Sequence, residues 1–177
     1  GHPKPWHGTD ALLDLSLALC GRGIDARLVV IGGGPGAGEL RRAFEEKGLG
    51  DRVEVTGPLS QEAAITVYRG CHVGLAPYED RDDFYFCPLK VLESLAAGVP
   101  LVASRIGDIP DLVQDAAWLV EPGHREALAD TVAAALANPD ARHDLARRGR
   151  ARVLGNYVWQ RHAERILDAV MALKTSR

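Results

Sequence analysis

The sequence has no long apolar run and no excess of positive charge. No stretch approaches the ~18 consecutive apolar residues that mark a membrane span, and no secretory signal pattern is present. Its 21 lysines and arginines are outnumbered by 24 acidic residues, which gives a net charge of −3 and a pI near 6.1. Proteins that bind nucleic acid or anionic membranes usually carry a basic surface, so the composition favours neither partner. We expect a cytoplasmic protein without a transmembrane segment.

Cysteine is also scarce. The three cysteines are an odd number without metal-ligand spacing, which predicts reduced thiols and no metal site. The 19 glycines and 10 prolines are spread along a chain that is 46% hydrophobic, which excludes disordered, collagen-like and low-complexity classes. A chain of 177 residues has room for one domain with a real core.

Short apolar runs alternate with amphipathic stretches, the pattern of a parallel sheet covered by helices. The predicted strands are Leu28–Ile31, Val53–Thr56, Val73–Ala76, Leu101–Ser104 and Ala117–Val120. The predicted helices are Thr9–Cys20, Glu39–Lys47, Ser60–Arg69, Pro88–Ala97, Arg125–Ala137, Asp140–Leu154 and Val158–Leu173. This order predicts an α/β fold with a doubly wound parallel sheet, in which ligands bind beyond the carboxyl ends of the strands.

A glycine-rich turn follows the first predicted strand. Gly32, Gly34 and Ala37 fit the spacing of a dinucleotide-binding fingerprint, whose glycines let the backbone approach a diphosphate. That fingerprint also needs an acid at the end of the next strand, and Glu54 lies within that strand instead. The turn is therefore either a dinucleotide site or a bend that makes room for another ligand or domain.

A more specific signal is the loop that leads into the helix Pro88–Ala97. The free N–H groups at the start of this helix point toward the carboxyl edge of the sheet. Lys90 lies in the first turn, where its charge opposes the helix dipole, and Glu93 follows one turn later. These two charges either bind a phosphate and a ribose or are ordinary surface charges.

Six motifs in this order resemble retaining glycosyltransferases of the GT-B fold, the glycosyltransferase group 1 family. They are Lys4–Gly8, Ile31–Pro35, Val53–Gly57, Ala76–Tyr78, Pro88–Ser104 and Asn156–Trp159. The resemblance implies that residues 1–177 are a Rossmann-like, donor-nucleotide-binding domain with helices on both faces, one half of a GT-B fold. An N-terminal acceptor-binding domain would be absent, and the first strand of the domain would precede Gly1. The whole enzyme would then move a sugar from a nucleoside diphosphate to an acceptor with retention, using no metal or other cofactor.

The same resemblance assigns the site residues. It implies that Glu93 holds the ribose and that Lys90, with the start of its helix, binds the diphosphate and sugar. Both are donor-side candidates for catalysis. Many relatives carry a glutamate where this sequence has Tyr85, so sugar contacts would come from the backbone near Phe86 and Cys87. The predicted donor-binding residues are Gly33, Gly34, Pro58, Leu59, Tyr85, Phe86, Cys87, Pro88, Leu89, Lys90 and Glu93, with Lys4 and His7 as candidate diphosphate contacts.

Three other functions stay open at this point: a GT-B-shaped sugar-nucleotide epimerase, a non-catalytic nucleotide-binding module and a flavin or nicotinamide oxidoreductase fragment. An arginine cluster between Arg142 and Arg152 either contacts an anionic polymer or lipid, or forms a solvated face balanced by acids. Trp118 and Trp159 are predicted to pack in the core or under the last helix.

Overall fold

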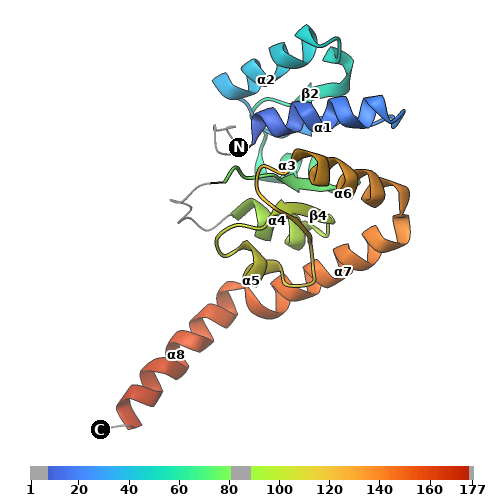
Figure 1. The fold of residues 1–177 in the computed structure, drawn as a ribbon. Coiled ribbons are helices and arrows are strands. Elements are labelled where there is room, and N and C mark those ends of the chain that lie inside the picture. The colour runs from blue at the N-terminus through green and yellow to red at the C-terminus, as the bar shows by residue number, and fades with distance from the viewer. Residues whose placement is uncertain (1–7, 81–88, 176–177) are drawn as a thin grey trace.

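The computed structural model describes residues 8–80 and 89–175, and in these ranges strands and helices alternate along the chain (Figure 1). The strands are β1 (Leu28–Val30), β2 (Val53–Val55), β3 (Gly74–Ala76), β4 (Leu101–Ser104) and β5 (Trp118–Val120). The first helices are α1 (Thr9–Gly21), α2 (Pro35–Glu46), α3 (Gln61–Arg69) and α4 (Leu89–Ala97), with a short 3₁₀ turn, η2 (Gly50–Arg52), before β2. The remaining helices are α5 (Ile109–Val113), α6 (Arg125–Ala137), α7 (Pro139–Asn156) and α8 (Trp159–Thr175).

All the described strand pairs are parallel, but they form two sets. β1 pairs with β2, with Leu28 opposite Val53, and β3, β4 and β5 pair in that order. The predicted α/β class with parallel strands is confirmed, whereas the single continuous sheet is not found among the described residues. β1 and β3 each keep one edge without a strand partner in the described part of the chain.

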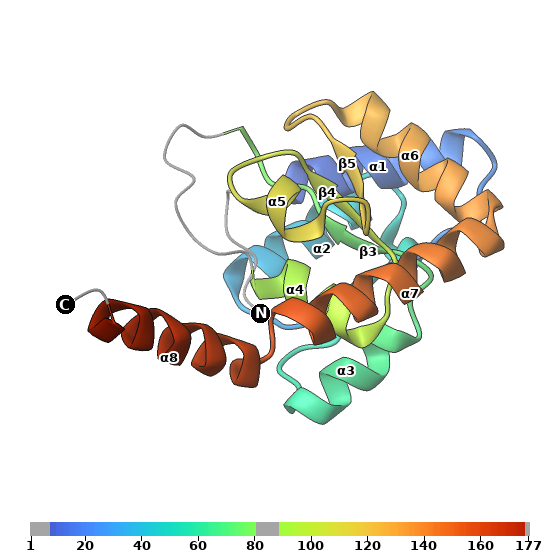
Figure 2. The same cartoon turned by 90° about the horizontal axis from the view of Figure 1, so that it is seen from below.

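Both faces of the set β3–β5 are covered by helices (Figure 2). Successive side chains of β4 point to opposite faces. Leu101 and Ala103 join a cluster with α4, α5 and α7, and Val102 joins a second cluster with α1 and α6. All four residues of β4 are buried, as expected of a central parallel strand.

Helix α1 contacts both sets of strands. Its Leu15 and Leu19 lie in the cluster with β4, β5 and α6. Its Leu12 and Leu13 pack against the third cluster, in which Phe44 of α2 is fully buried beside β1 and β2. The apolar residues of α1 therefore point in two directions, and this helix connects the two halves of the core.

The predicted helices and strands all exist, with two notable differences. Helix α2 begins at Pro35, four positions earlier than Glu39, because proline is favoured at a first helical position and Gly34 supplies the left-handed φ of 96° before it. Helix α5 was not predicted, since its five residues are too few to show a helical period. The predicted start of the first helix at Thr9 is found, with Gly8 as the N-cap.

Three of the arginines of α7 bind carbonyl groups of other helices. Arg142 donates to the carbonyl oxygens of Ala135 and Leu136 at the end of α6, at 2.7 and 2.6 Å. Arg150 donates to Ala96 O of α4 at 2.6 Å, and Arg152 donates to Asp111 O of α5 at 2.6 Å. Cations at helix C-termini satisfy free carbonyls and complement the dipole. These three arginines are therefore structural residues, and the predicted balance by acids is found at Arg147 and Arg148, which pair with Asp144 and Asp115.

The last helix, α8, extends away from the rest of the chain in Figure 1. Trp159 at its start is 87% exposed, so the prediction that this side chain packs was wrong. Trp118 is partly buried against the cluster of α1, β5 and α6, as predicted. None of the helices in the described ranges is long and apolar enough to cross a membrane.

Candidate functional site

The starts of α1, α2 and α4 lie on one side of the molecule (Figure 1). The carboxyl ends of β1 and β3 lie on the same side. α2 follows the end of β1 directly, and Gly8 at the start of α1 packs against Pro77, just beyond β3. The first N–H groups of a helix lack partners within it and carry partial positive charge. This edge of the sheet is therefore suited to an anion.

The glycine turn and the loop after β2 form one part of the site. The N–H of Gly32 donates to Thr56 Oγ1 at 3.2 Å, and an isolated bridge joins Gly32 to Gly57. A Cβ on Gly33 would lie 3.5 Å from Pro58 Cδ, an ordinary van der Waals distance, so the two loops lie against each other. The structure thus places two groups of predicted donor-binding residues, Gly33 with Gly34 and Pro58 with Leu59, next to each other.

Exposure differs among these four predicted residues. Gly33 is buried, whereas Gly34 is exposed and caps α2. Pro58 and Leu59 are exposed, Leu59 by 39%. Gly34, Pro58 and Leu59 are accessible to a ligand, whereas Gly33 is covered by its surroundings.

A dinucleotide site at this turn would need a carboxylate at the end of β2. The Glu54 side chain is directed to Arg27, with which it forms an exposed ion pair at 3.4 Å. Thr56 occupies the end of β2, where its hydroxyl accepts from Gly32 and donates to Gly57 O at 2.9 Å. No carboxylate therefore stands where the fingerprint requires one for a ribose.

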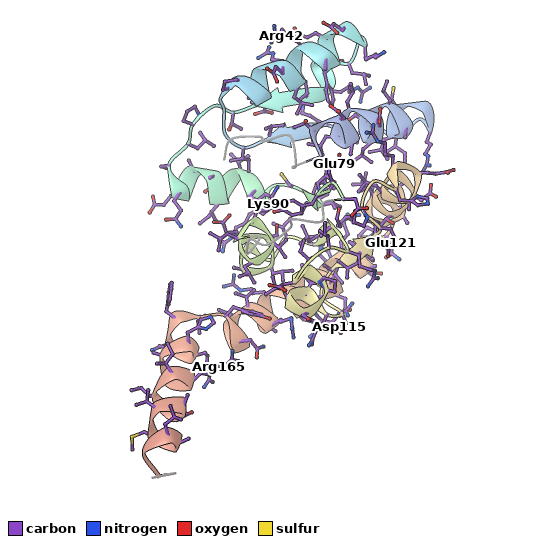
Figure 3. The ribbon with its side chains drawn as sticks, turned by 60° about the vertical axis from the view of Figure 1, so that its left-hand side comes forward. Arg42, Glu79, Lys90, Asp115, Glu121 and Arg165 are labelled. Carbon is purple, nitrogen blue, oxygen red and sulfur yellow. The ribbon has the colours of Figure 1, made fainter. Side chains whose placement is uncertain are left out.

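Lys90 forms the second part of the site, in the first turn of α4 (Figure 3). Its Nζ lies 4.3 Å from the centroid of the Tyr78 ring, within the range of a cation–π contact. Burial lowers the pKa of Lys90 to about 8, because desolvation disfavours the charged form. Among the described residues no carboxylate forms an ion pair with it.

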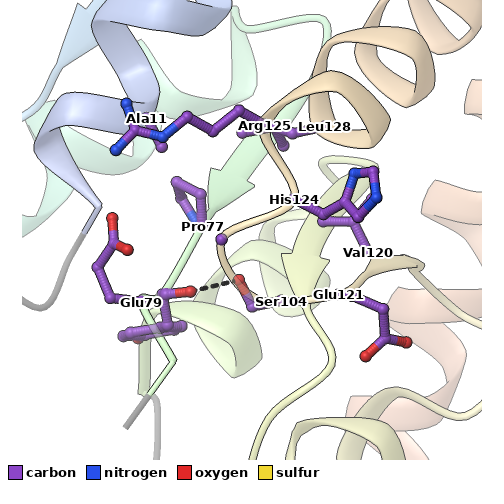
Figure 4. Close-up of a pocket in the computed structure, with 11 residues that line it drawn as sticks. Ala11, Pro77, Glu79, Ser104, Val120, Glu121, His124, Arg125 and Leu128 are labelled. Atoms are coloured by element: carbon purple, nitrogen blue, oxygen red, sulfur yellow. Dashed lines mark hydrogen bonds between the residues drawn. The ribbon is translucent and has the colours of Figure 1, made fainter.

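Tyr78 is fixed by its surroundings. Its side chain is 2% exposed, and its carbonyl oxygen accepts a hydrogen bond from Ser104 Oγ at 2.7 Å (Figure 4). Gly8 has a φ of 64°, and a Cβ there would overlap the carbonyl oxygen of Pro77. Sequence analysis noted Pro77 and Tyr78 as a motif but missed the contacts of Tyr78 with Lys90 and Ser104, for which the sequence holds no local signal.

Of the remaining predicted site residues, some lie on α4 and the others lie outside the described residues. Leu89 is 64% exposed at the start of α4, and Glu93 is exposed one turn beyond Lys90. The predicted contacts outside the described residues are Lys4, His7, Tyr85, Phe86, Cys87 and Pro88. The structure thus brings Leu89, Lys90 and Glu93 together on the first turns of one helix.

A small cavity lies beside Tyr78, between the ends of β3, β4 and β5 and the start of α6 (Figure 4). Its polar lining includes Glu79, Ser104, Glu121 and His124, and its volume is about 10 Å³. That is room for one water molecule and not for a nucleotide. Within residues 8–80 and 89–175, no three His, Cys, Asp or Glu side chains gather as metal ligands.

Several known proteins are similar to this chain. A GDP-mannose-dependent alpha-(1-6)-phosphatidylinositol dimannoside mannosyltransferase from Mycobacterium tuberculosis is 32% identical over 168 residues, which cover 94% of this chain and 41% of that protein. Sucrose-phosphate synthase from Thermosynechococcus elongatus has a similar structure, with a TM-score of 0.78 and 26% identity over 98% of this chain and 44% of that one. The Anabaena protein HepE in complex with UDP has a TM-score of 0.81 at 19% identity, over 97% of this chain and 47% of that one.

These similarities agree on the fold and on the family. The chain spans less than half the length of each of these proteins. Its fold is that of the C-terminal domain of a GT-B glycosyltransferase. The family described as glycosyl transferases group 1 matches residues 1–152, and the chain therefore belongs to that family.

Proposed function

We propose that this chain is the donor-binding domain of a retaining glycosyltransferase, and that it binds a nucleoside diphosphate sugar at the carboxyl edge of its strands. The observation that carries the proposal is the position of Lys90. Its ammonium group is desolvated at the start of α4 without an ion-pair partner among the described carboxylates. A cation in this place costs stability unless an anion reaches it, and the diphosphate of a donor is such an anion.

Glu93 supplies the second contact. It is exposed one turn after Lys90, so a donor whose diphosphate lies at the start of α4 brings its ribose within reach of this carboxylate. A carboxylate accepts hydrogen bonds from both hydroxyls of a ribose. Gly34 would border the diphosphate, and Pro58 and Leu59 border the side of the site where the base would lie.

In the whole protein, the bond between the anomeric carbon and the diphosphate oxygen breaks, and a bond to the acceptor oxygen forms on the same face. The departing diphosphate takes the proton of the acceptor hydroxyl. Lys90 and the N–H groups at the start of α4 stabilise the negative charge that develops on the diphosphate. The chain's part is therefore to position the donor and stabilise the leaving group.

The supporting comparisons differ in the nucleotide. The mycobacterial relative is named for GDP-mannose, and HepE was solved with UDP. The proposal therefore specifies a nucleoside diphosphate and leaves the base to the experiment.

Calorimetric titration of the 177-residue chain with UDP, GDP, ADP and NAD⁺ tests the proposal. Glu93→Gln removes the negative charge and one of the two acceptor oxygens of the ribose contact. Glu126→Gln, at an exposed glutamate in the first turn of α6, is the matched control. We expect one nucleoside diphosphate to bind, about 10-fold more weakly to Glu93→Gln and unchanged to Glu126→Gln, which corresponds to one lost charge-assisted hydrogen bond. Binding of NAD⁺ alone, equal in both variants, would contradict the proposal and favour a dinucleotide site at Gly32.

A further inference from the structure

Lys90 does not adopt the arrangement expected of a lysine near a helix start. A lysine side chain is flexible and usually extends its ammonium group into water. At the start of α4 the helix dipole also repels it. Instead, Nζ of Lys90 lies over the ring of Tyr78, 4.3 Å from the centroid. The ring face therefore holds the cation in place.

The ring itself belongs to the rigid core. Tyr78 is in the cluster that contains Ala76 of β3 and Val91 and Leu95 of α4, and its side chain is 2% exposed. Its carbonyl oxygen is bound by Ser104 Oγ at the end of β4. Ring and backbone are thus fixed to β3, β4 and α4 at once.

We propose that Tyr78 is a positioning residue of the nucleotide site: the face of its ring holds the Lys90 ammonium group at the start of α4, ready for the donor diphosphate. This inference rests on the proposed function, because it assigns Lys90 to a diphosphate. It adds that the aromatic face of Tyr78 holds the lysine in place. Preorganisation of this kind removes the cost of ordering the lysine when the ligand arrives.

Three variants separate the face from the hydroxyl and from simple packing. Tyr78→Phe keeps the ring, Tyr78→Leu keeps an apolar side chain without a ring, and Tyr78→Leu combined with Lys90→Met tests whether the effect passes through the lysine. Tyr157→Leu is the control, since that ring holds Arg152 at 5.8 Å on α7, in another cation–π pair. Binding of UDP and GDP to the chain is measured by calorimetry.

We expect Tyr78→Phe and Tyr157→Leu to bind within about 2-fold of the unchanged chain, and Tyr78→Leu to bind about 5- to 30-fold more weakly. In the Lys90→Met background, Tyr78→Leu should add less than about 2-fold. Binding by Tyr78→Leu equal to that of the unchanged chain overturns the proposal. So does an equal loss in the Lys90→Met background, which would mean that the ring only supports packing.

Nuclear magnetic resonance of the lysine side chains gives a second test that needs no ligand. The chain has few lysines, so the Lys90 ε-methylene signal can be assigned by its loss in Lys90→Arg. A ring below it shifts this signal upfield of the exposed Lys47 signal, and Tyr78→Leu removes the shift. If the chain bound no nucleoside diphosphate, the proposed function would fail on its own. Identical Lys90 and Lys47 shifts would overturn the positioning of Lys90 by Tyr78 whatever the binding result.

Discussion

Replacing Lys90 by methionine should stabilise the fold while it weakens nucleotide binding. Burial lowers the pKa of Lys90 from 10.5 to about 8, so the folded state disfavours the charged amine by about 3 kcal/mol. The contact with Tyr78 returns about 0.5–2 kcal/mol of that. Methionine has a similar length, no charge and a side chain that adapts to irregular space. We expect Lys90→Met to raise the free energy of unfolding at pH 7 by about 1–3 kcal/mol.

The pH dependence follows from the direction of the shift. Between the folded pKa near 8 and the unfolded value of 10.5, the unfolded chain binds more protons at Lys90 than the folded chain does. Stability of the unchanged chain therefore rises with pH across this window. Burial raises the pKa of Tyr68 to about 12, which lowers stability only above about pH 10 and does so equally in both proteins. The advantage of Lys90→Met should shrink steadily from pH 8 to pH 10.

Urea unfolding of both proteins at pH 7, 8.5 and 9.5 measures this difference. Lys47→Met is the matched control, because Lys47 is exposed at the end of α2 and its replacement should change stability by less than about 0.5 kcal/mol. If Lys90→Met were less stable than the unchanged chain at pH 7, or if the difference did not depend on pH, the desolvation argument would be refuted.

Two further predictions concern the scaffold around the site. Arg152→Lys should lower the free energy of unfolding by about 1–3 kcal/mol, because a lysine cannot reproduce the guanidinium contacts with Asp111 O, Leu112 O and Gln114. Its control is Arg147→Lys, which should lower the free energy of unfolding by less than about 0.5 kcal/mol, because Arg147 forms an exposed pair with Asp144. Gly8→Ala should cost about 2–4 kcal/mol through its φ of 64° and the overlap with Pro77, and Gly155→Ala, with open space around it, should be neutral or stabilising. Urea unfolding checks both pairs, and equal effects within either pair would contradict the contacts described.

Local pattern was sufficient for most of the fold. Leu101–Ser104 is a continuous apolar run bounded by Pro100 and Gly107, and it forms a strand that is buried on both faces. The division of the strands into two sets could not be predicted, because strand pairing depends on contacts between distant segments. The exposure of Trp159 could not be predicted either, because an aromatic side chain is buried only where another element of the fold covers it.

The candidate site was predicted in part. The glycine turn at Gly32–Gly34 and the helix that carries Lys90 and Glu93 have local signals, namely a fixed spacing of glycines and a charge opposed to a helix dipole. The contact of Lys90 with Tyr78 spans a loop and has no such signal. The same holds for the support of Tyr78 by Ser104, which is 26 positions away.

The arginines of α7 and Lys90 differ in how their charges lie relative to helix dipoles. Arg142, Arg150 and Arg152 donate to carbonyl oxygens at the ends of helices, where positive charge is favourable, and their contacts explain them as structural residues. Lys90 lies at the opposite end of a helix, desolvated and over a π face, where the folded chain alone gains little from its charge. Among the described residues this charge forms no ion pair, and it opposes the dipole of its helix, which supports the proposed diphosphate ligand. Replacing Lys90 therefore removes a desolvation cost from the free chain and, in the proposed complex, removes the cation that contacts the diphosphate.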